Sequence, residues 1–210
     1  MCVDYRDMNR ASPKDDFTLP HIYTLVDNTA TSSLYSFMDG FSRYMEKTTF
    51  ITLWGTFCYK VMAFGLKNAG ATYQRAMVAL FHDMMHNEIE VYVEDMIAKS
   101  ASEEEHLVNL KKLFERLRKY KLKLNLYRCT FGVNSGKLLR FIVSQRGIEV
   151  DPGKVRAILE MPHPCTEKEV RGFLGRLNYI ARFISQLTAT CVPIFKLLRK
   201  NQVVEWNEDC

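Results

Sequence analysis

The sequence predicts a mixed α+β domain over residues 1–150, followed by a helical module over residues 151–210. Two observations support this division. Up to about residue 150, segments rich in β-branched and aromatic residues alternate with segments of helical periodicity. Pro162 and Pro164 then interrupt the chain, and only helical periodicity continues after them.

The first strands are predicted from alternation and from turn residues. Residues 34–39, LYSFMD, alternate and end in an acid, as in a strand that runs into a turn. Residues 48–61 are rich in β-branched and aromatic side chains, and Gly55 follows Trp54 near their middle. We therefore expect two strands joined by a turn at Trp54-Gly55.

A helix and a hairpin are expected next. The helix extends from Ala69 to His86, with Asn68 as a possible N-cap and apolar residues at helical spacing. Residues 88–100, EIEVYVEDMIAKS, follow as a hairpin of apolar strands with Glu94 and Asp95 at its tip. Adjacent acids at such a tip fit either a solvated turn or a metal site.

A second helix begins at a capping box, Ser102 to Glu105, with acids at its start and bases toward its end. Its apolar face is expected to contain Leu107, Leu110, Phe114 and Leu117. Residues 129–150 predict further strands, with turns at Gly132, Gly136 and Gly147.

Two capped helices are expected in the last part of the chain. Asp151 and Pro152 begin a short one. A capping box from Thr166 to Glu169 begins a long one. The inward residues of the long helix are expected to be Val170, Phe173, Leu174, Leu177, Ile180 and Ile184.

Composition excludes several classes of protein. The 210 residues are 47% hydrophobic and 25% charged, which is ordinary for a globular domain. No apolar run reaches the roughly 18 residues that span a bilayer, so no membrane association is expected. The charged N-terminus does not resemble a signal peptide, and its abrupt start indicates a piece of a longer polypeptide.

Cysteine spacing and charge give weaker information. The six cysteines contain no C-x-x-C pair, so reduced thiols and an intracellular location are expected. The formal net charge is +5, and residues 99–128 contain nine Lys or Arg against four Glu. This clustering fits either a polyanion partner or a helix with a solvated basic face.

The acids suggest a specific chemistry. The order strand, acid, helix, strand, two acids, strand is typical of a split βαβ arrangement, in which Asp39 would meet Glu94 and Asp95 at one sheet edge. Converging carboxylates repel unless a cation neutralises them. Mg²⁺ fits because it prefers oxygen ligands, and two such ions can bind the attacking and leaving oxygens in phosphoryl transfer. A solvated turn remains the alternative.

A series of ordered motifs resembles the reverse transcriptase of gypsy-type LTR retrotransposons. The matching segments cover nearly the whole chain: CVDYRDMNRASPKDDFTLP, SFMDGFS, KTTFITLWGTFCYKVMAFGLKNAGATYQRAM, YVEDMIAKS, HLVNLKKLFERLRKYKLKLN, GIEVDPGKV and EVRGFLGRLNYIARFI. The tetrapeptide YVED alone would be a weak signal, whereas the ordered series is specific.

The resemblance implies a polymerase palm with partial fingers over residues 1–150 and a helical thumb over residues 151–210. It implies an RNA-directed DNA polymerase that uses Mg²⁺ or Mn²⁺, an RNA or DNA template, a DNA primer and dNTPs. In the family, protease, RNase H and integrase domains adjoin this one in a polyprotein, and none is expected within these 210 residues. A cytoplasmic particle or the nucleus is the implied location.

The resemblance also assigns residues. Asp39, Glu94 and Asp95 match the catalytic, metal-binding acids, and Tyr44, Phe64 and Gly65 match the nucleotide site. The implied contacts with nucleic acid are Gln74, Arg75, Tyr92, Leu139, Arg140, Phe141, Arg171 and Arg176. Several of these residues have an alternative: Tyr44 and Phe64 also fit core packing, and Arg75, Arg171 and Arg176 also fit solvated helix faces.

This chain departs from the family pattern at several positions. Glu94 replaces an aspartate, and its extra methylene moves the carboxylate by about 1 Å. A connection usually found after Tyr44 is missing, and Arg43 replaces a small residue. Arg140 occupies a glycine position where a positive φ is expected. We therefore expect impaired catalysis, with a catalytically dead nucleic-acid-binding protein or a non-functional retroelement fragment as alternatives.

Overall fold

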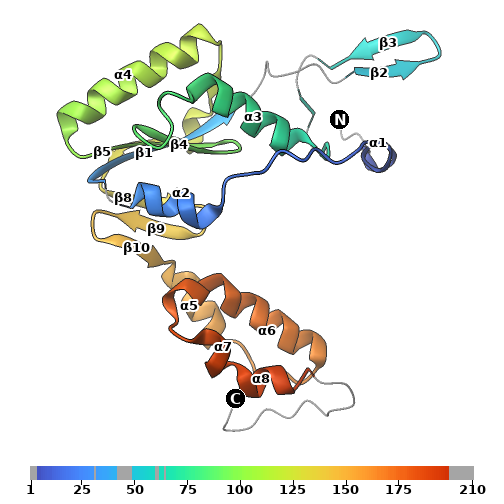
Figure 1. Cartoon of the computed structure of the whole chain (residues 1–210), viewed down its shortest axis with the longest axis vertical. Coiled ribbons are helices and arrows are strands. Elements are labelled where there is room, and N and C mark those ends of the chain that lie inside the picture. Colours follow the sequence, from blue (N-terminus) through green and yellow to red (C-terminus); the bar gives the residue numbers. More distant parts are fainter. Residues whose placement is uncertain (1–3, 31, 42–48, 60–61, 64, 199–210) are drawn as a thin grey trace. The chain divides into compact units, whose positions relative to one another are not determined.

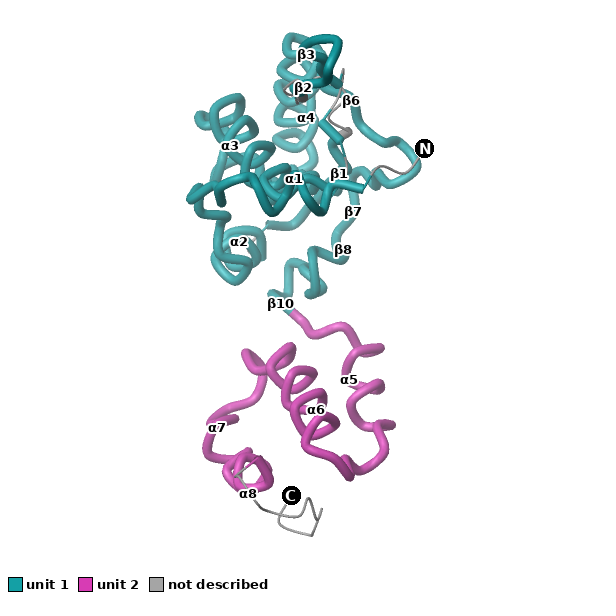
Figure 2. Tube along the Cα trace, turned by 90° about the vertical axis from the view of Figure 1, so that its right-hand side faces the viewer, with its two compact units in different colours: residues 1–148 teal, residues 149–210 magenta. Residues whose placement is uncertain are grey.

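The structure is a computed structural model that describes residues 4–30, 32–41, 49–59, 62–63 and 65–198. It divides into two compact units, Met1–Ile148 and Glu149–Cys210, which Figure 2 shows in different colours. The assignment of residues 1–150 to a palm and 151–210 to a thumb stays a prediction. Among the described helices, none is long and apolar enough to cross a membrane.

An antiparallel sheet forms the centre of the first unit (Figure 1). Its strands follow the order β4-β5-β1-β6, and β7 also pairs with β1. Their bounds are β1 (Leu34–Phe41), β4 (Ile89–Tyr92), β5 (Asp95–Ser100), β6 (Lys123–Leu124) and β7 (Thr130–Val133). The predicted strand and the acidic hairpin are both confirmed.

Two further antiparallel groups of strands belong to the same part of the chain. The hairpin β2 (Thr49–Thr52) and β3 (Gly55–Cys58) turns at the predicted point, and Gly55 has φ 135°, a value that favours glycine. A second group runs in the order β10-β9-β8. Its strands are β8 (Ser135–Leu138), β9 (Phe141–Ser144) and β10 (Gly147–Val150).

Four helices are described in the first unit: α1 (Arg6–Ala11), α2 (Ile22–Thr29), α3 (Ala69–Phe81) and α4 (Glu103–Lys119). Helix α3 ends five residues before the predicted His86. Asn68 occupies the N-cap position of α3, but its side chain makes no capping bond. It instead accepts from the Asp15 amide and donates to the Pro13 carbonyl, so it fastens the N-terminal segment to the helix start.

The two-residue period of the strands sorts side chains between two cores. Met38 and Met96 lie in the core with α3 and α4, whereas Tyr35 and Ile97 lie in the core with α2. Leu138 from β8, together with Phe141 and Val143 from β9, completes this second core. Helix α2 and the β8–β9 hairpin cover the face of the sheet opposite to α3 and α4 (Figure 1).

The buried face of α4 differs from the predicted one. Leu107 is 69% exposed and Phe114 is 39% exposed, while His106, Asn109, Leu113 and Leu117 are buried. Two serine hydroxyls of the sheet explain why this face of α4 is buried. Ser36 Oγ lies 2.7 Å from His106 Nε2, and Ser100 Oγ lies 3.0 Å from His106 Nδ1. A buried imidazole bonded at both nitrogens replaces the expected apolar contact.

Half of the predicted capping box of α4 is formed. The Ser102 hydroxyl accepts from the Glu105 amide, but the Glu105 carboxylate accepts from the Ala101 amide rather than from that of Ser102. Both bonds still satisfy amides at the start of the helix.

The second unit is helical, as predicted. Its helices are α5 (Pro152–Leu159), α6 (Glu167–Ile180), the 3₁₀ turn η2 (Ala181–Phe183), α7 (Leu187–Thr190) and α8 (Val192–Lys196). Asp151 caps α5, and the capping box of Thr166 and Glu169 at α6 is fully formed. The core contains Val170, Cys191 and Ile194, with Phe173, Leu174 and Leu177 packed against it.

The corrected face of α4 gives a stability test. Leu113→Ala is expected to lower the free energy of unfolding by about 2–5 kcal/mol, because a fully buried leucine leaves a cavity. Leu107→Ala is expected to change it by less than about 0.5 kcal/mol, because Leu107 is exposed. Urea unfolding of the full chain, followed by circular dichroism, measures both. Similar losses in the two variants would show that the α4 face is assigned wrongly.

Candidate functional site

Strand pairing brings the three acids to one end of the sheet. Asp39 on β1 is the antiparallel partner of Asp95 on β5. The Gly40 amide donates to the Glu94 carbonyl at 2.7 Å and extends this pairing into the β4–β5 turn. Because alternate residues share a face, Asp39 and Asp95 point to the same side as Phe37 and Ile97, toward the β8–β9 hairpin.

Gly40 permits a close approach behind these acids. A Cβ atom at this position would lie 2.5 Å from the Tyr73 hydroxyl and 3.3 Å from the Glu94 carbonyl oxygen. The Tyr73 hydroxyl donates to the Gly40 carbonyl at 3.3 Å. Burial, and then the charges of Glu94, Asp39 and Asp95, raise the pKa of Tyr73, so its phenol stays neutral. Tyr73 therefore fixes the backbone of β1 without adding charge.

Gln74 fixes the acidic hairpin from α3. Its amide nitrogen donates to the Val91 carbonyl at 3.0 Å, and its amide oxygen accepts from the Val93 amide at 2.6 Å. Val93 has φ 51°, which is costly for a β-branched residue and is held by this pair of bonds. Gln74 is fully buried, so the prediction that it contacts a template strand is wrong.

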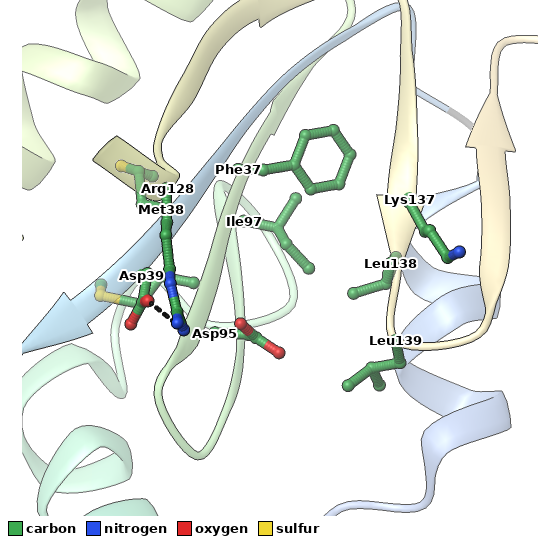
Figure 3. A pocket seen from close by; sticks show the side chains of 10 residues that line it. Phe37, Met38, Asp39, Asp95, Ile97, Arg128, Lys137, Leu138 and Leu139 are labelled. Carbon is green, nitrogen blue, oxygen red and sulfur yellow. Dashed lines mark hydrogen bonds and ion pairs between the residues drawn. The ribbon is translucent and has the colours of Figure 1, made fainter. Parts of the chain in front are cut away.

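The acids affect one another electrostatically. Partial burial, followed by the charge of Asp39, raises the pKa of both Glu94 and Asp95. Arg128, at the end of the 3₁₀ turn η1 (Leu126–Arg128), acts in the opposite direction on both. Its Nη1 lies 3.4 Å from Asp39 Oδ2, and Figure 3 shows the guanidinium drawn between Asp39 and Asp95.

The donor types suit a divalent metal ion, but their arrangement is not closed around one. Three carboxylates are hard oxygen ligands of the kind that Mg²⁺ prefers, and their mutual repulsion favours a cation. Within the described residues, however, no three acid, histidine or cysteine side chains are close enough together to hold a metal ion. Arg128 provides the positive charge next to Asp39 in this arrangement.

A pocket of about 180 Å³ lies beside the acids. Its lining residues come from β1, β5, η1 and the β8–β9 hairpin: Phe37, Met38, Asp39, Asp95, Met96, Ile97, Arg128, Lys137, Leu138 and Leu139. Figure 3 shows Lys137, Leu138 and Leu139 across the pocket from Asp95. This pocket, between the acids and the hairpin tip, can bind the polar end of another chain.

The structure of the β8–β9 hairpin tip contradicts two predictions. The positive φ expected at Arg140 is found instead at Leu139, with φ 54°, so Arg140 is not the strained residue. Phe141 is 1% exposed and packs in the core at 5.8 Å from the Tyr23 ring, so the prediction that it contacts nucleic acid is wrong. Tyr92 and Arg140 line a second pocket, of about 310 Å³, together with residues 19–23.

The other predicted contact residues lie outside this cluster. Arg75 forms an ion pair with Asp15 at 2.6 Å and lies over the Phe17 ring. Gly65 is described, with φ 94°, and its carbonyl accepts from the Asn9 side chain. Tyr44 and Phe64, like Arg43, lie outside the described residues. On α6, Arg171 pairs with Glu167 at 2.6 Å and Arg176 is exposed beside Met161.

Sequence reasoning missed Arg128, Tyr73 and the structural role of Gln74. The glycine after Asp39 was a usable signal for a close approach at β1. Nothing comparable pointed to Arg128, because it reaches Asp39 across 89 positions of the chain.

The comparisons with known proteins agree on one family. Residues 1–175 match the family described as "Reverse transcriptase (RNA-dependent DNA polymerase)". The Retrovirus-related Pol polyproteins from transposons 297 and gypsy of Drosophila melanogaster are 32% and 29% identical to the chain over 97% and 95% of its length. The chain spans only 20% of each of these relatives.

Solved structures show the same fold. The foamy viral protease-reverse transcriptase in complex with double-stranded DNA matches 98% of this chain and 38% of its own, with a TM-score of 0.84 and 21% identity. The same viral protein in complex with an RNA/DNA hybrid matches with a TM-score of 0.77. These similarities confirm the predicted α+β polymerase fold.

The raised pKa of Asp95 gives a pH test in the presence of EDTA. In the folded chain, Asp95 stays protonated to a higher pH than in the unfolded chain, where its pKa has the ordinary value of 3.8. The stability contribution of Asp95 therefore falls as pH rises from about 3.8 through the raised pKa. Asp95→Asn removes this loss. We expect its melting temperature to exceed that of the wild type by about 1–3 °C at pH 7 and to match it near pH 3.

Asp83→Asn is the matched control with the opposite sign. The Arg116 hydrogen bond lowers the pKa of Asp83, so this carboxylate stabilises the fold at pH 7 and loses that contribution as pH falls below about 3.8. The control is therefore expected to melt below the wild type at pH 7. If Asp95→Asn also melted lower at pH 7, the acids would not repel in the folded chain.

Proposed function

The chain belongs to the reverse transcriptase family, and we propose that it extends a DNA primer along an RNA or DNA template as the palm and thumb of a retrotransposon polyprotein. The observation that carries the proposal is the pairing of Asp39 with Asp95, with Glu94 in the adjoining turn. Three carboxylates from two segments of the chain then lie at one sheet edge, where Asp39 and Asp95 line a pocket.

We propose that Asp39, Glu94 and Asp95 hold Mg²⁺ or Mn²⁺. When bound, a divalent cation supplies the positive charge that carboxylates and phosphate oxygens need in order to approach each other. The protein contributes rigid placement: Tyr73 and Gly40 fix β1, and Gln74 fixes the hairpin. The raised pKa values of Glu94 and Asp95 are those of a site whose acids repel without a counter-ion.

In the proposed reaction, the primer 3′-hydroxyl attacks the α-phosphate of a dNTP. A phosphodiester bond forms, the bond to the β-phosphate breaks, pyrophosphate leaves, and the hydroxyl proton passes to water. The pocket between Asp95 and the Leu138–Leu139 tip supports placement of the primer terminus, because the acids lie on one side and a hairpin on the other. Tyr44, Phe64 and Gly65 are proposed to bind the nucleotide.

Contacts with the nucleic-acid backbone are proposed for exposed basic residues. Arg140 is exposed at the hairpin tip, and Arg171 and Arg176 are exposed on α6. Arg75, in the middle of α3, forms an ion pair with Asp15, and Tyr92 precedes the acidic turn. Arginines contribute to binding by neutralising phosphates. The full polyprotein, with its adjacent domains, is proposed to act in a cytoplasmic particle or in the nucleus.

We propose that this copy is catalytically weak. Glu94 adds a methylene to a metal-binding acid, and misplacement by about 1 Å can cost on the order of 100-fold in rate. The ion pair of Arg128 with Asp39 and the absence of a three-acid cluster among the described residues also favour a second candidate function. In that alternative the chain binds primer–template duplex without extending the primer.

Primer extension distinguishes the two functions. On poly(rA)/oligo(dT) with Mg²⁺ or Mn²⁺, we expect this chain to extend the primer at least about 100-fold more slowly than an intact relative. Asp39→Asn is expected to abolish the remaining extension, because it removes a central carboxylate. Glu94→Asp is expected to raise the rate without restoring it fully, because the connection after Tyr44 is also missing. Gel analysis of labelled primer measures all three.

Arg146→Gln, in the β9–β10 turn, is the control and should leave extension unchanged. Extension that survives Asp39→Asn would overturn the assigned site. Extension as fast as that of an intact relative would overturn the proposed impairment.

Duplex binding provides a separate prediction for α6. In a filter-binding titration from 50 to 200 mM salt, each phosphate contact contributes about 0.9 to the slope of log K against log salt. The double variant Arg171→Gln, Arg176→Gln is therefore expected to have a slope smaller by about 1.8. Arg156→Gln, an exposed arginine of α5, should leave the slope unchanged. A double variant that retained the full slope would exclude phosphate contacts by α6.

A further inference from the structure

We propose that Arg128 is a displaceable internal cation, which occupies Asp39 in the metal-free chain and leaves it when a divalent cation binds. The inference rests on the proposed function, because it takes Asp39, Glu94 and Asp95 as the carboxylates that hold that cation. Arg128 then has a positioning role, and the site has two states. In one state Arg128 pairs with Asp39, and in the other the divalent cation does.

Backbone hydrogen bonds fix the position of Arg128. Strand β6 pairs with the end of β1, where Gly40 and Phe41 face Leu124 and Lys123. The Asn125 amide then donates to the Asp39 carbonyl at 2.9 Å, and the Arg128 amide donates to the Asn125 carbonyl at 2.9 Å. The turn that carries Arg128 is thus anchored to the residue whose carboxylate Arg128 contacts.

The contact itself is weak enough to be displaced. A single nitrogen, Nη1, reaches a single oxygen, Oδ2, at 3.4 Å, whereas charge-assisted bonds are normally 2.7–2.9 Å long. The Arg128 side chain is 75% exposed, and that of Asp39 is 16% exposed. Ion pairs of this kind contribute little to stability and cost little to break.

The charges around the Arg128–Asp39 pair favour the replacement of Arg128 by a divalent cation. Arg128 carries one positive charge, while Asp39, Glu94 and Asp95 together carry three negative charges when ionised. Arg128 lowers the pKa of Glu94 and Asp95 without cancelling the opposite effect of burial and of Asp39. A divalent ion brings twice the charge and accepts several carboxylate oxygens at once, so it competes successfully for Asp39.

The side chain also has space into which it can move. Arg128 lines the pocket of about 180 Å³ together with Lys137 and Leu139, and Figure 3 shows its guanidinium beside Asp39. Once released, an exposed guanidinium beside the acids can pair with a phosphate of a bound nucleic acid. Metal loading and duplex contact would then be linked through one side chain.

Mn²⁺ binding to the full chain tests the proposal without a requirement for catalysis. Electron paramagnetic resonance of free Mn²⁺ measures the dissociation constant at the site that Asp39→Asn removes. Arg128→Gln is expected to bind Mn²⁺ about two- to fivefold more tightly than the wild type, because the competing charge is gone. Arg128→Lys, which keeps the charge, should remain close to the wild type. Arg146→Gln, which also loses one positive charge, should not differ.

The possible results separate this inference from the proposed function. Wild-type Mn²⁺ binding that Asp39→Asn removes, with equal or weaker binding by Arg128→Gln, overturns the inference and leaves the metal site intact. Binding that is absent in every variant, or unaffected by Asp39→Asn, overturns the metal site and this inference with it. If circular dichroism shows that Arg128→Gln does not fold, Arg128→Met gives the same neutral comparison.

Discussion

The candidate site depends on the register between β1 and β5. The pairing runs from Leu34 opposite Ser100 to Asp39 opposite Asp95. A slip of one residue would turn Asp39 toward the core of α3 and α4 and leave Asp95 without its acidic partner. The same register places apolar side chains of both strands in the two cores, so the packing that stabilises the fold also fixes the position of the acids.

This register brings three carboxylates that repel one another close together, and the surrounding residues hold them there. Tyr73 contacts the backbone of β1, and Gln74 holds the left-handed turn at Val93. Neither residue carries charge, so neither relieves the repulsion among the acids. Arg128 does so in part, because η1 is tied to Asp39 by a backbone hydrogen bond. Under the proposed function, a divalent cation bound at this edge would relieve the repulsion among the acids.

Local signals predicted much of the fold. The hairpins at Trp54-Gly55 and Glu94-Asp95, the cap at Asp151 and the capping box at Thr166 depend on residues close in sequence, and all four are present. The α4 face was wrong because two serines of the sheet bury His106 and Asn109 in place of Leu107. Gln74 and Phe141 were assigned to nucleic acid because a motif gives residue type and order, not burial.

The sequence by itself determined the strand and helix order, the family, and the three acids whose spacing suggests metal chemistry. Periodicity, caps and motifs act over short distances, and for that reason they can be read without coordinates. Only the tertiary structure decided which charges face those acids. Arg128 and Asp39 meet because β6 pairs with β1, and pairing between distant strands depends on the packing of the whole sheet rather than on any local pattern.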